Sequence, residues 1–197
     1  MRPIPISGEI CILAGGLSSR MGRDKARLRL SGKSLLQHVK NVAQKSAIRG
    51  GAGAPPYQEL QHVKIAAQKS SWPVRVIRRD LVVRCGPLGG VYTALKTTPF
   101  DVVLFLACDM PFVTDDLIGR FLELKDPAFT HGPEGAGFPF LLPKSALSFV
   151  EKQIAWERYS IQLLARKLRT RKVRPRDARE VFNVNTREDL VLARGIH

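Results

Sequence analysis

The chain has few cysteines and no long hydrophobic run. Cys11, Cys85 and Cys108 are odd in number, and their spacing matches neither a CxxC pair nor a zinc site, which argues against a disulfide framework or a structural zinc ion. No apolar run approaches the roughly 20 residues that a membrane helix needs, and the first ten residues lack the apolar core of a signal peptide. These absences predict a cytoplasmic protein that does not bind membranes.

Acidic residues are also scarce. The chain has 17 Asp and Glu against 32 Lys and Arg, which gives a net charge of +15. A surface of this kind attracts polyanions, including nucleic acids and phosphorylated small molecules. However, the sequence has no zinc-finger spacing, no aromatic RNA-binding motif and no heptad zipper. Much of the excess lies in residues 158–180, where a solvated basic face is the simplest interpretation, so we expect no nucleic-acid partner.

The hydrophobic runs that are present are short and typical of buried parallel strands. Residues 10–14 and 102–107 are continuous apolar runs rich in β-branched residues, and each ends at a glycine or polar loop. Residues 74–78 form a third candidate strand with an alternating pattern. The 197 residues, 44% of them hydrophobic, are enough for one domain with a substantial core.

Helical patterns lie between these candidate strands. They cover residues 34–45, 57–70, 88–96 and 115–124. Thr114, which precedes two aspartates, is typical of a helix N-cap. The alternation of strands and helices predicts an α/β fold, with a three-layer, Rossmann-like, mostly parallel but mixed sheet and helices on both faces.

The pattern changes after residue 126. A turn-rich segment is followed by a predicted short strand near 138–142 and then by a helix. Residues 181–184 are predicted to form another short strand. Thr186, with Glu188 and Asp189 two and three positions later, predicts the cap of a final helix.

The loop after the first predicted strand combines bare backbone with positive charge. Gly15 and Gly16 follow the strand directly, and Arg20, Gly22 and Lys25 come next. Glycines let backbone N–H groups approach an anion closely, and the two cations suit charge-assisted hydrogen bonds to phosphates. The spacing is neither GxxxxGK[ST] nor GxGxxG, so it excludes a Walker ATPase and a plain dinucleotide fold.

A second loop, after residues 102–107, presents an isolated carboxylate. Asp109 follows this wholly apolar strand, where an acid is costly unless it faces solvent, is paired or binds a metal. With phosphates expected nearby, Mg²⁺ is the natural partner, because it binds few carboxylates and several phosphate oxygens. Thr114 is a better helix cap than Asp109, so we interpret Asp109 as a metal ligand.

Four motifs together resemble one enzyme family. They are LAGGLSSRMGRDKA at 13–26, GPLGG at 86–90, CDMP at 108–111 and FNVNTREDL at 182–190. In their order and in their coverage of nearly the whole chain they resemble the molybdenum cofactor guanylyltransferases, which are MobA-like nucleotidyltransferases. The resemblance implies a Mg²⁺-dependent transfer of guanylyl from GTP to the terminal phosphate of molybdopterin, with pyrophosphate released.

The resemblance also implies roles for individual residues. Those for nucleotide binding are Leu13, Ala14, Gly15, Gly16, Arg20, Gly22, Lys25, Asp80 and Asp109. Those for molybdopterin binding are Gly86, Pro87, Leu88, Asn183 and Asn185. Catalysis would use Arg20, Lys25 and Asp109, with Asp109 also the Mg²⁺ ligand.

The resemblance further implies one domain over residues 1–197, with the nucleotide side at about 1–112 and the molybdopterin side at about 113–197. Transient contact with proteins that load or accept molybdopterin is expected as well.

Three other interpretations stay open at this point. The first is a CTP-dependent cytidylyltransferase, although Gly15, Gly16 and Cys108 favour GTP. The second is another MobA-like NTP transferase, such as a sugar-nucleotide pyrophosphorylase. The third is an inactive relative that only binds.

Overall fold

The structure is a computed structural model that describes residues 7–14, 28–49 and 72–196. The strands of this part are β1 (Gly8–Leu13), β2 (Arg29–Leu30), β3 (Lys33–Ser34), β4 (Val74–Ile77), β5 (Val102–Ala107), β6 (Ala128–Gly132), β7 (Gly135–Pro143) and β8 (Arg171–Val173). The helices are α1 (Leu35–Arg49), α2 (Pro87–Thr97), α3 (Asp115–Leu122), α4 (Leu147–Ala155), α5 (Ile161–Lys167) and α6 (Arg187–Ile196), with short 3₁₀ turns at Lys144–Ala146 and Ala178–Val181.

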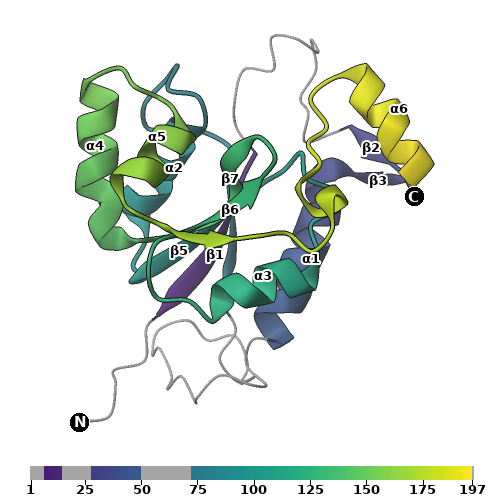
Figure 1. The fold of residues 1–197 in the computed structure, drawn as a ribbon, viewed down its shortest axis with the longest axis horizontal. Coiled ribbons are helices and arrows are strands. Elements are labelled where there is room, and N and C mark those ends of the chain that lie inside the picture. Colours follow the sequence, from purple (N-terminus) through teal and green to yellow (C-terminus); the bar gives the residue numbers. More distant parts are fainter. Residues whose placement is uncertain (1–6, 15–27, 50–71, 197) are drawn as a thin grey trace.

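Six of the strands form one mixed sheet (Figure 1). Its order is β4-β1-β5-β7-β6-β8, and β1 pairs in parallel with both β4 and β5. β7 runs antiparallel to β5 and β6, while β8 is parallel to β6. The carboxyl ends of β4, β1 and β5 therefore meet at one edge of the sheet, the edge at which open α/β folds bind ligands.

Helices cover both faces of the sheet, as predicted. Ile10 and Ile12 of β1 point to one face, where they pack in a cluster with residues of α1 and α3. Cys11 and Leu13 point to the other, where the cluster includes residues of α2, α4 and α5. A period of two is what a strand buried on both faces requires, and the three-layer α/β prediction is confirmed.

An ion pair between neighbouring strands borders this core. The Glu9 carboxylate of β1, only 3% exposed, accepts a 2.6 Å hydrogen bond from the Arg75 guanidinium of β4. Burial raises the pKa of the neighbouring Cys11 thiol to about 12. All three cysteines are buried and free, so Cys11 is an inert core residue.

Most predicted elements are present in the described part of the chain. The predicted strands at 10–14, 74–78, 102–107 and 138–142 correspond to β1, β4, β5 and β7, and the predicted helices at 34–45, 88–96 and 115–124 to α1, α2 and α3. Thr114 caps α3, since its hydroxyl accepts a 3.1 Å hydrogen bond from the Leu117 N–H. The predicted helix at 57–70 lies outside the described residues.

The predicted strand at 181–184 is wrong. Val181 ends a 3₁₀ turn, and the residues after it form no ladder. The N–H of Val184 donates instead to the carbonyl of Asp109, which lies in a loop rather than in a strand. The apolar residues that suggested a strand are buried for another reason: Val184 belongs to a small hydrophobic cluster with Leu30, Leu35 and Ala193.

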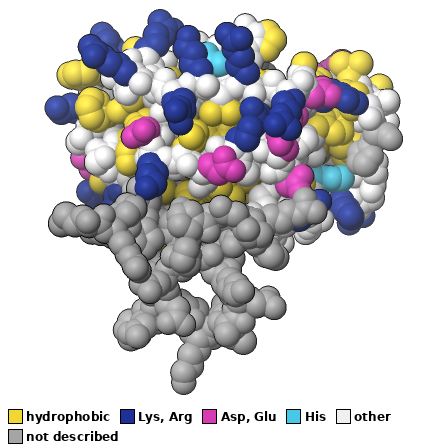
Figure 2. All heavy atoms as spheres, turned by 60° about the horizontal axis from the view of Figure 1, so that its bottom comes forward, with side chains coloured by type: hydrophobic (Ala, Val, Ile, Leu, Met, Phe, Trp, Pro, Cys, Tyr) yellow, Lys and Arg dark blue, Asp and Glu magenta, His cyan; other side chains and the backbone are white. Residues whose placement is uncertain are grey.

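None of the helices in the described ranges combines the length and the apolar character that a bilayer crossing requires. Figure 2 shows Lys and Arg side chains recurring over the described part of one face, with Asp and Glu between them. On this face the positive charge is spread out and interrupted by acidic side chains.

Candidate active site at the carboxyl edge of the sheet

Backbone hydrogen bonds bring the ends of β4, β1 and β5 into line. The Ala14 N–H donates to the Ile77 carbonyl at 2.8 Å, and the Cys108 N–H donates to the Leu13 carbonyl at 3.1 Å. The first bond continues the β1–β4 ladder past the end of β1, and the second continues the β1–β5 ladder past the end of β5, which places Ala14 beside the start of the Asp109 loop. The side chain of Leu13 is buried in the core, so a contact between Leu13 and a nucleotide would have to use its backbone.

Asp109 is half-buried two residues after the end of β5. Its carbonyl accepts a 2.8 Å hydrogen bond from the N–H of Val184. This bond joins the predicted metal residue to the C-terminal motif that was predicted to face molybdopterin. The structure therefore brings together two predicted regions from distant parts of the sequence.

Asn183 and Asn185 flank Val184 and are exposed, while Val184 is fully buried. Both asparagines are therefore open to solvent on either side of the buried Val184. The segment after them is fixed, because the N–H groups of Asn185 and Thr186 both donate to the Asp189 carboxylate at 2.8 Å. The Asp189 N–H donates in turn to the Thr186 hydroxyl at 3.1 Å, so Thr186 caps α6 as predicted.

Asp80 lies against the first turn of α2. A β-carbon at Gly89 would come within 2.9 Å of the Val82 carbonyl and 3.0 Å of the Asp80 carboxylate, so only glycine allows this close approach. Burial raises the pKa of the Asp80 carboxyl above its ordinary value. Thr93 holds the same loop, since its hydroxyl accepts from the Leu81 N–H at 2.8 Å.

The other members of the GPLGG motif have different surroundings. Gly86 has a positive φ of 55° and precedes Pro87, the first residue of α2, and both are exposed. Leu88 is completely buried in the core beneath them, so a contact between Leu88 and molybdopterin would have to use its backbone. A β-carbon at Gly90 would lie 3.1 Å from the Leu13 side chain, so Gly90 packs closely against the end of β1.

The remaining predicted site residues lie outside the described residues. They are Gly15, Gly16, Arg20, Gly22 and Lys25. Their segment follows Ala14 directly, and Ala14 is at the carboxyl edge. Their predicted roles in binding the base and the phosphates stay predictions.

Comparison with known proteins identifies the family. A family model described as the MobA-like NTP transferase domain matches residues 10–171. The chain belongs to this family. The match covers most of the chain, including the Asp80 and Asp109 loops, and the predicted family resemblance is confirmed.

Relatives within this family agree over nearly the full length. The chain is 35% identical to a probable molybdenum cofactor guanylyltransferase of Opitutus terrae, over 90% of each chain. It is 30% identical to a molybdenum cofactor guanylyltransferase of Vibrio atlanticus, over 95% of each. The chain is thus a MobA-like nucleotidyltransferase with named guanylyltransferases among its relatives.

Solved structures share the fold. Molybdopterin-guanine dinucleotide biosynthesis protein A from Archaeoglobus fulgidus matches with a TM-score of 0.64 and 18% identity, over 95% of this chain and 97% of that one. A Mycobacterium tuberculosis protein solved in complex with manganese matches with a TM-score of 0.59 and 16% identity, over 96% and 98%. At these identities the likeness concerns the fold.

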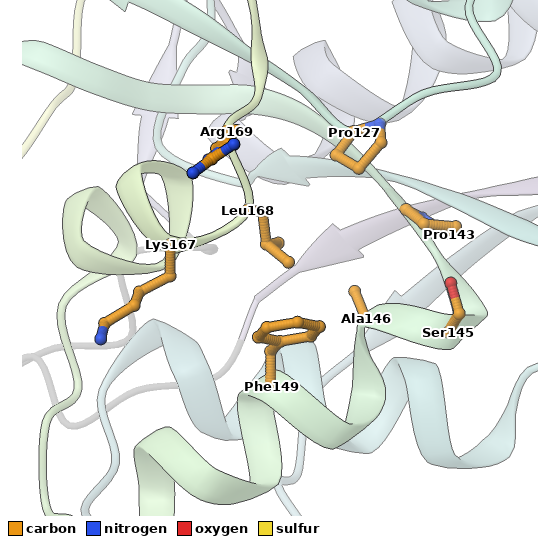
Figure 3. Close-up of a pocket in the computed structure, with 8 residues that line it drawn as sticks. All are labelled: Pro127, Pro143, Ser145, Ala146, Phe149, Lys167, Leu168 and Arg169. Carbon is orange, nitrogen blue, oxygen red and sulfur yellow. The ribbon is translucent and has the colours of Figure 1, made fainter.

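Figure 3 shows a hollow that belongs to the opposite end of the sheet. Its volume is about 340 Å³, and its lining includes Pro127, Pro143, Phe149 and Leu168. Pro143 pairs with Val102, the first residue of β5, whereas Asp109 follows the last. None of the predicted site residues lines this hollow, so it is separate from the candidate active site of this nucleotidyltransferase.

Two residues of the site region were missed from the sequence. Thr93 ties down the Asp80 loop, and Glu180 accepts a hydrogen bond from the Thr114 hydroxyl. A signal for Glu180 was available, since Asp177 and Glu180 have the spacing of a capping box, and the structure forms that box. Thr93 lies within a helix and had no comparable signal.

Proposed function

We propose that this chain transfers the guanylyl group of GTP to the terminal phosphate of molybdopterin, which gives the guanine dinucleotide cofactor and pyrophosphate. One observation carries the proposal: the hydrogen bond between Asp109 and Val184 joins the predicted nucleotide and metal loop to the predicted molybdopterin segment at the carboxyl edge of the sheet. The near full-length relatives named as molybdenum cofactor guanylyltransferases support the same substrates.

The chemistry asks for positioning rather than for a strong base. The attacking phosphate oxygen of molybdopterin is already anionic, so catalysis consists of holding two polyanions in line and stabilising the charge that develops as pyrophosphate leaves. Asp80 follows β4, and Asp109 follows β5. These two strands flank β1, so the strands lie about 10 Å apart, which is two inter-strand spacings. This spacing leaves room for a nucleotide across the end of β1.

The carboxylate of Asp109 is a suitable ligand for Mg²⁺. Within the described ranges no group of three or more His, Cys, Asp and Glu side chains is arranged to hold a metal by itself. Mg²⁺ commonly binds through one or two carboxylates and completes its shell with waters and substrate phosphates. Asp109 would supply such a carboxylate, and the bound ion would neutralise phosphate charge. A protein of the same fold was solved in complex with manganese, which supports a divalent cation in the proposed reaction.

Several finer points belong to the proposal. Arg20 and Lys25 would bind the phosphates, Gly22 would shape their loop, and Gly15 with Gly16 would leave room for guanine. The division into a nucleotide side at about 1–112 and a molybdopterin side at about 113–197 is part of the same proposal. So are a cytoplasmic location and transient contact with proteins that load or accept molybdopterin.

The test is pyrophosphate release by the purified protein with Mg²⁺ and molybdopterin, with GTP, CTP and ATP compared. Release with GTP alone would support the proposal. Release with CTP would support nucleotidyl transfer but show that the nucleotide substrate is CTP and not GTP. A matched reaction without molybdopterin controls for simple hydrolysis. No release with any nucleotide would contradict the proposed activity and leave a binding function.

A further inference from the structure

Two segments far apart in the sequence, 109–114 and 180–184, lie side by side and run in opposite directions. The contacts between them are the Asp109 carbonyl with the Val184 N–H at 2.8 Å, the rings of Phe112 and Phe182 with centroids 6.1 Å apart, and the Thr114 hydroxyl with the Glu180 carboxylate. The first segment holds the predicted metal residue, and the second leads into the exposed asparagines. Their relative position therefore sets the geometry between the two halves of the site.

Glu180 anchors one end of this contact. Its side chain is only 4% exposed, and a buried carboxylate is costly unless it is hydrogen-bonded. One oxygen accepts from the Thr114 hydroxyl, and the other accepts from the N–H groups of Arg176 and Asp177 at 2.8 Å and 3.4 Å. Both oxygens are thus engaged, which fixes the orientation of the side chain.

The partner of Glu180 is itself held rigidly. The Thr114 hydroxyl accepts from the Leu117 N–H at 3.1 Å while it donates to Glu180. Glu180 is therefore attached to the N-terminus of α3, which directly follows the Asp109 loop. Arg176 adds a second link to α3 through a 2.9 Å ion pair with Asp116.

We infer that Glu180 is a positioning residue for the proposed transfer. Its carboxylate holds the segment that carries Asn183 and Asn185 against the Asp109 loop, and so sets where molybdopterin is held relative to the reacting nucleotide. The inference rests on the proposed function. Glu180 acts through this segment, because its own side chain is buried away from solvent.

The experiment measures pyrophosphate release with GTP and molybdopterin varied separately. Glu180→Leu keeps a similar volume and removes both acceptors. We expect the KM for molybdopterin to rise about tenfold and the KM for GTP to stay within twofold. Glu180→Gln should restore near wild-type values, because its amide oxygen can still accept from the backbone and its NH₂ can donate to Thr114.

Glu9→Gln is the matched control, since Glu9 is an equally buried glutamate at the amino end of β1. A merely destabilising change lowers the folded fraction and therefore kcat, and leaves both KM values unchanged. An unchanged KM for molybdopterin in Glu180→Leu would overturn the inference. If Glu180→Leu fails to fold, Thr114→Val, with Thr114→Ser as the conservative variant, decides by the same change in KM.

A second measurement separates this inference from the proposed function. Hydrogen exchange at the Val184 amide reports the link between the segments whether or not the enzyme accepts molybdopterin. We expect faster exchange in Glu180→Leu and no change in Glu9→Gln. If wild type releases no pyrophosphate but exchange responds in this way, the function is wrong and the positional link holds. Unchanged exchange in Glu180→Leu contradicts the link itself.

Discussion

The main-chain carbonyl of Asp109 accepts a hydrogen bond from the N–H of Val184, 2.8 Å away. The bond joins backbone to backbone, so it does not depend on which side chain stands at either position. Replacing the Asp109 side chain therefore leaves the connection between the two halves of the site in place. The chemical role of the Asp109 carboxylate can therefore be tested separately from the contribution of the Asp109 backbone to the fold.

Asp109→Asn should abolish most of the activity and change stability little. Removing one preorganised electrostatic contact costs about 3 kcal/mol of transition-state stabilisation, or about a hundredfold in kcat. Pyrophosphate release at increasing Mg²⁺ and a thermal melt measure the two effects. Asp101→Asn, at the opposite end of β5 and exposed, is the matched control and should keep wild-type turnover. Full Mg²⁺-dependent activity in Asp109→Asn would remove Asp109 from the metal site.

Strands β1 and β5 were predictable because each is buried on both faces, and residues 10–13 of β1 and 102–107 of β5 are continuous apolar runs. Thr114 was equally clear, because an N-cap is a local signal that needs only its own helix. The edge strand β8, with Arg171 and Lys172 exposed, was missed, since its pairing with β6 is a long-range contact. No local pattern shows which strand a short basic segment will join.

The error at 181–184 has the same origin. Val184 is buried because α6 and the β2–β3 hairpin close over it, and a strand would have produced the same apolar signal. The link from Glu180 to Thr114 could not be predicted for a related reason, since the cap signals at Thr114 and at Asp177 are local and do not show that the two segments meet. The site was therefore predictable as a set of motifs, and the contact that holds them together required the fold.

Gly89→Ala should weaken both the fold and the nucleotide site. The new β-carbon would stand 2.9 Å from the Val82 carbonyl and 3.0 Å from the Asp80 carboxylate, so the Asp80 loop must move. Overpacking of this kind typically costs 1–3 kcal/mol, or about 2 kcal/mol here. We expect urea unfolding at a lower midpoint and a raised KM for GTP.

Gly119→Ala is the control for this change. Gly119 also lies within a helix, α3, but a β-carbon there meets nothing within 4 Å. Alanine is favoured over glycine in an open helical position by about 1 kcal/mol, so Gly119→Ala should stabilise the protein. A stabilised Gly89→Ala would mean that the loop at Asp80 yields easily and that Gly89 is not required for its position.

Asp80→Asn should stabilise the free protein at neutral pH. Burial raises the pKa of Asp80 above its ordinary value of 3.8, so the folded state disfavours the charged form. The contribution of Asp80 to stability is fully present below the unfolded pKa and is lost as the pH rises through the folded pKa. The gain from Asp80→Asn should therefore be seen at pH 7 and disappear toward pH 3.8. The same variant should bind GTP more weakly.

Asp177→Asn should change the stability at pH 7 in the opposite direction from Asp80→Asn. Hydrogen bonds from the Arg179 side chain and backbone lower the pKa of Asp177 to about 2. Its stabilising contribution is present above the unfolded pKa of 3.8 and is lost as the pH falls toward 2, so Asp177→Asn should destabilise the protein at pH 7. Urea unfolding between pH 3 and 8 measures both variants. A destabilised Asp80→Asn at pH 7 would contradict burial as the cause at Asp80, and a stabilised Asp177→Asn would contradict the role of Arg179 at Asp177.

Breaking the ion pair between the buried Glu9 and the half-buried Arg75 should destabilise the protein, whereas replacing both residues should change its stability little. Glu9→Leu leaves the Arg75 guanidinium, which also donates to Thr97 and to the Ala94 carbonyl, without its carboxylate. Removing one partner of a fully buried pair costs about 3–5 kcal/mol, and the partial exposure of Arg75 places the expected loss below that range. We expect that loss in urea unfolding of Glu9→Leu at pH 7.

The double variant Glu9→Leu with Arg75→Met should recover most of this stability. Well-packed apolar residues often replace a buried ion pair at no net cost, and the buried Nε of Arg75 has no hydrogen-bond partner within the described part of the protein, so methionine also removes an unsatisfied donor. The pair lies at the amino end of the strands, away from Asp109, so pyrophosphate release per folded molecule should match wild type. A double variant as unstable as Glu9→Leu would show that the pair contributes to the fold beyond the compensation of its own charges.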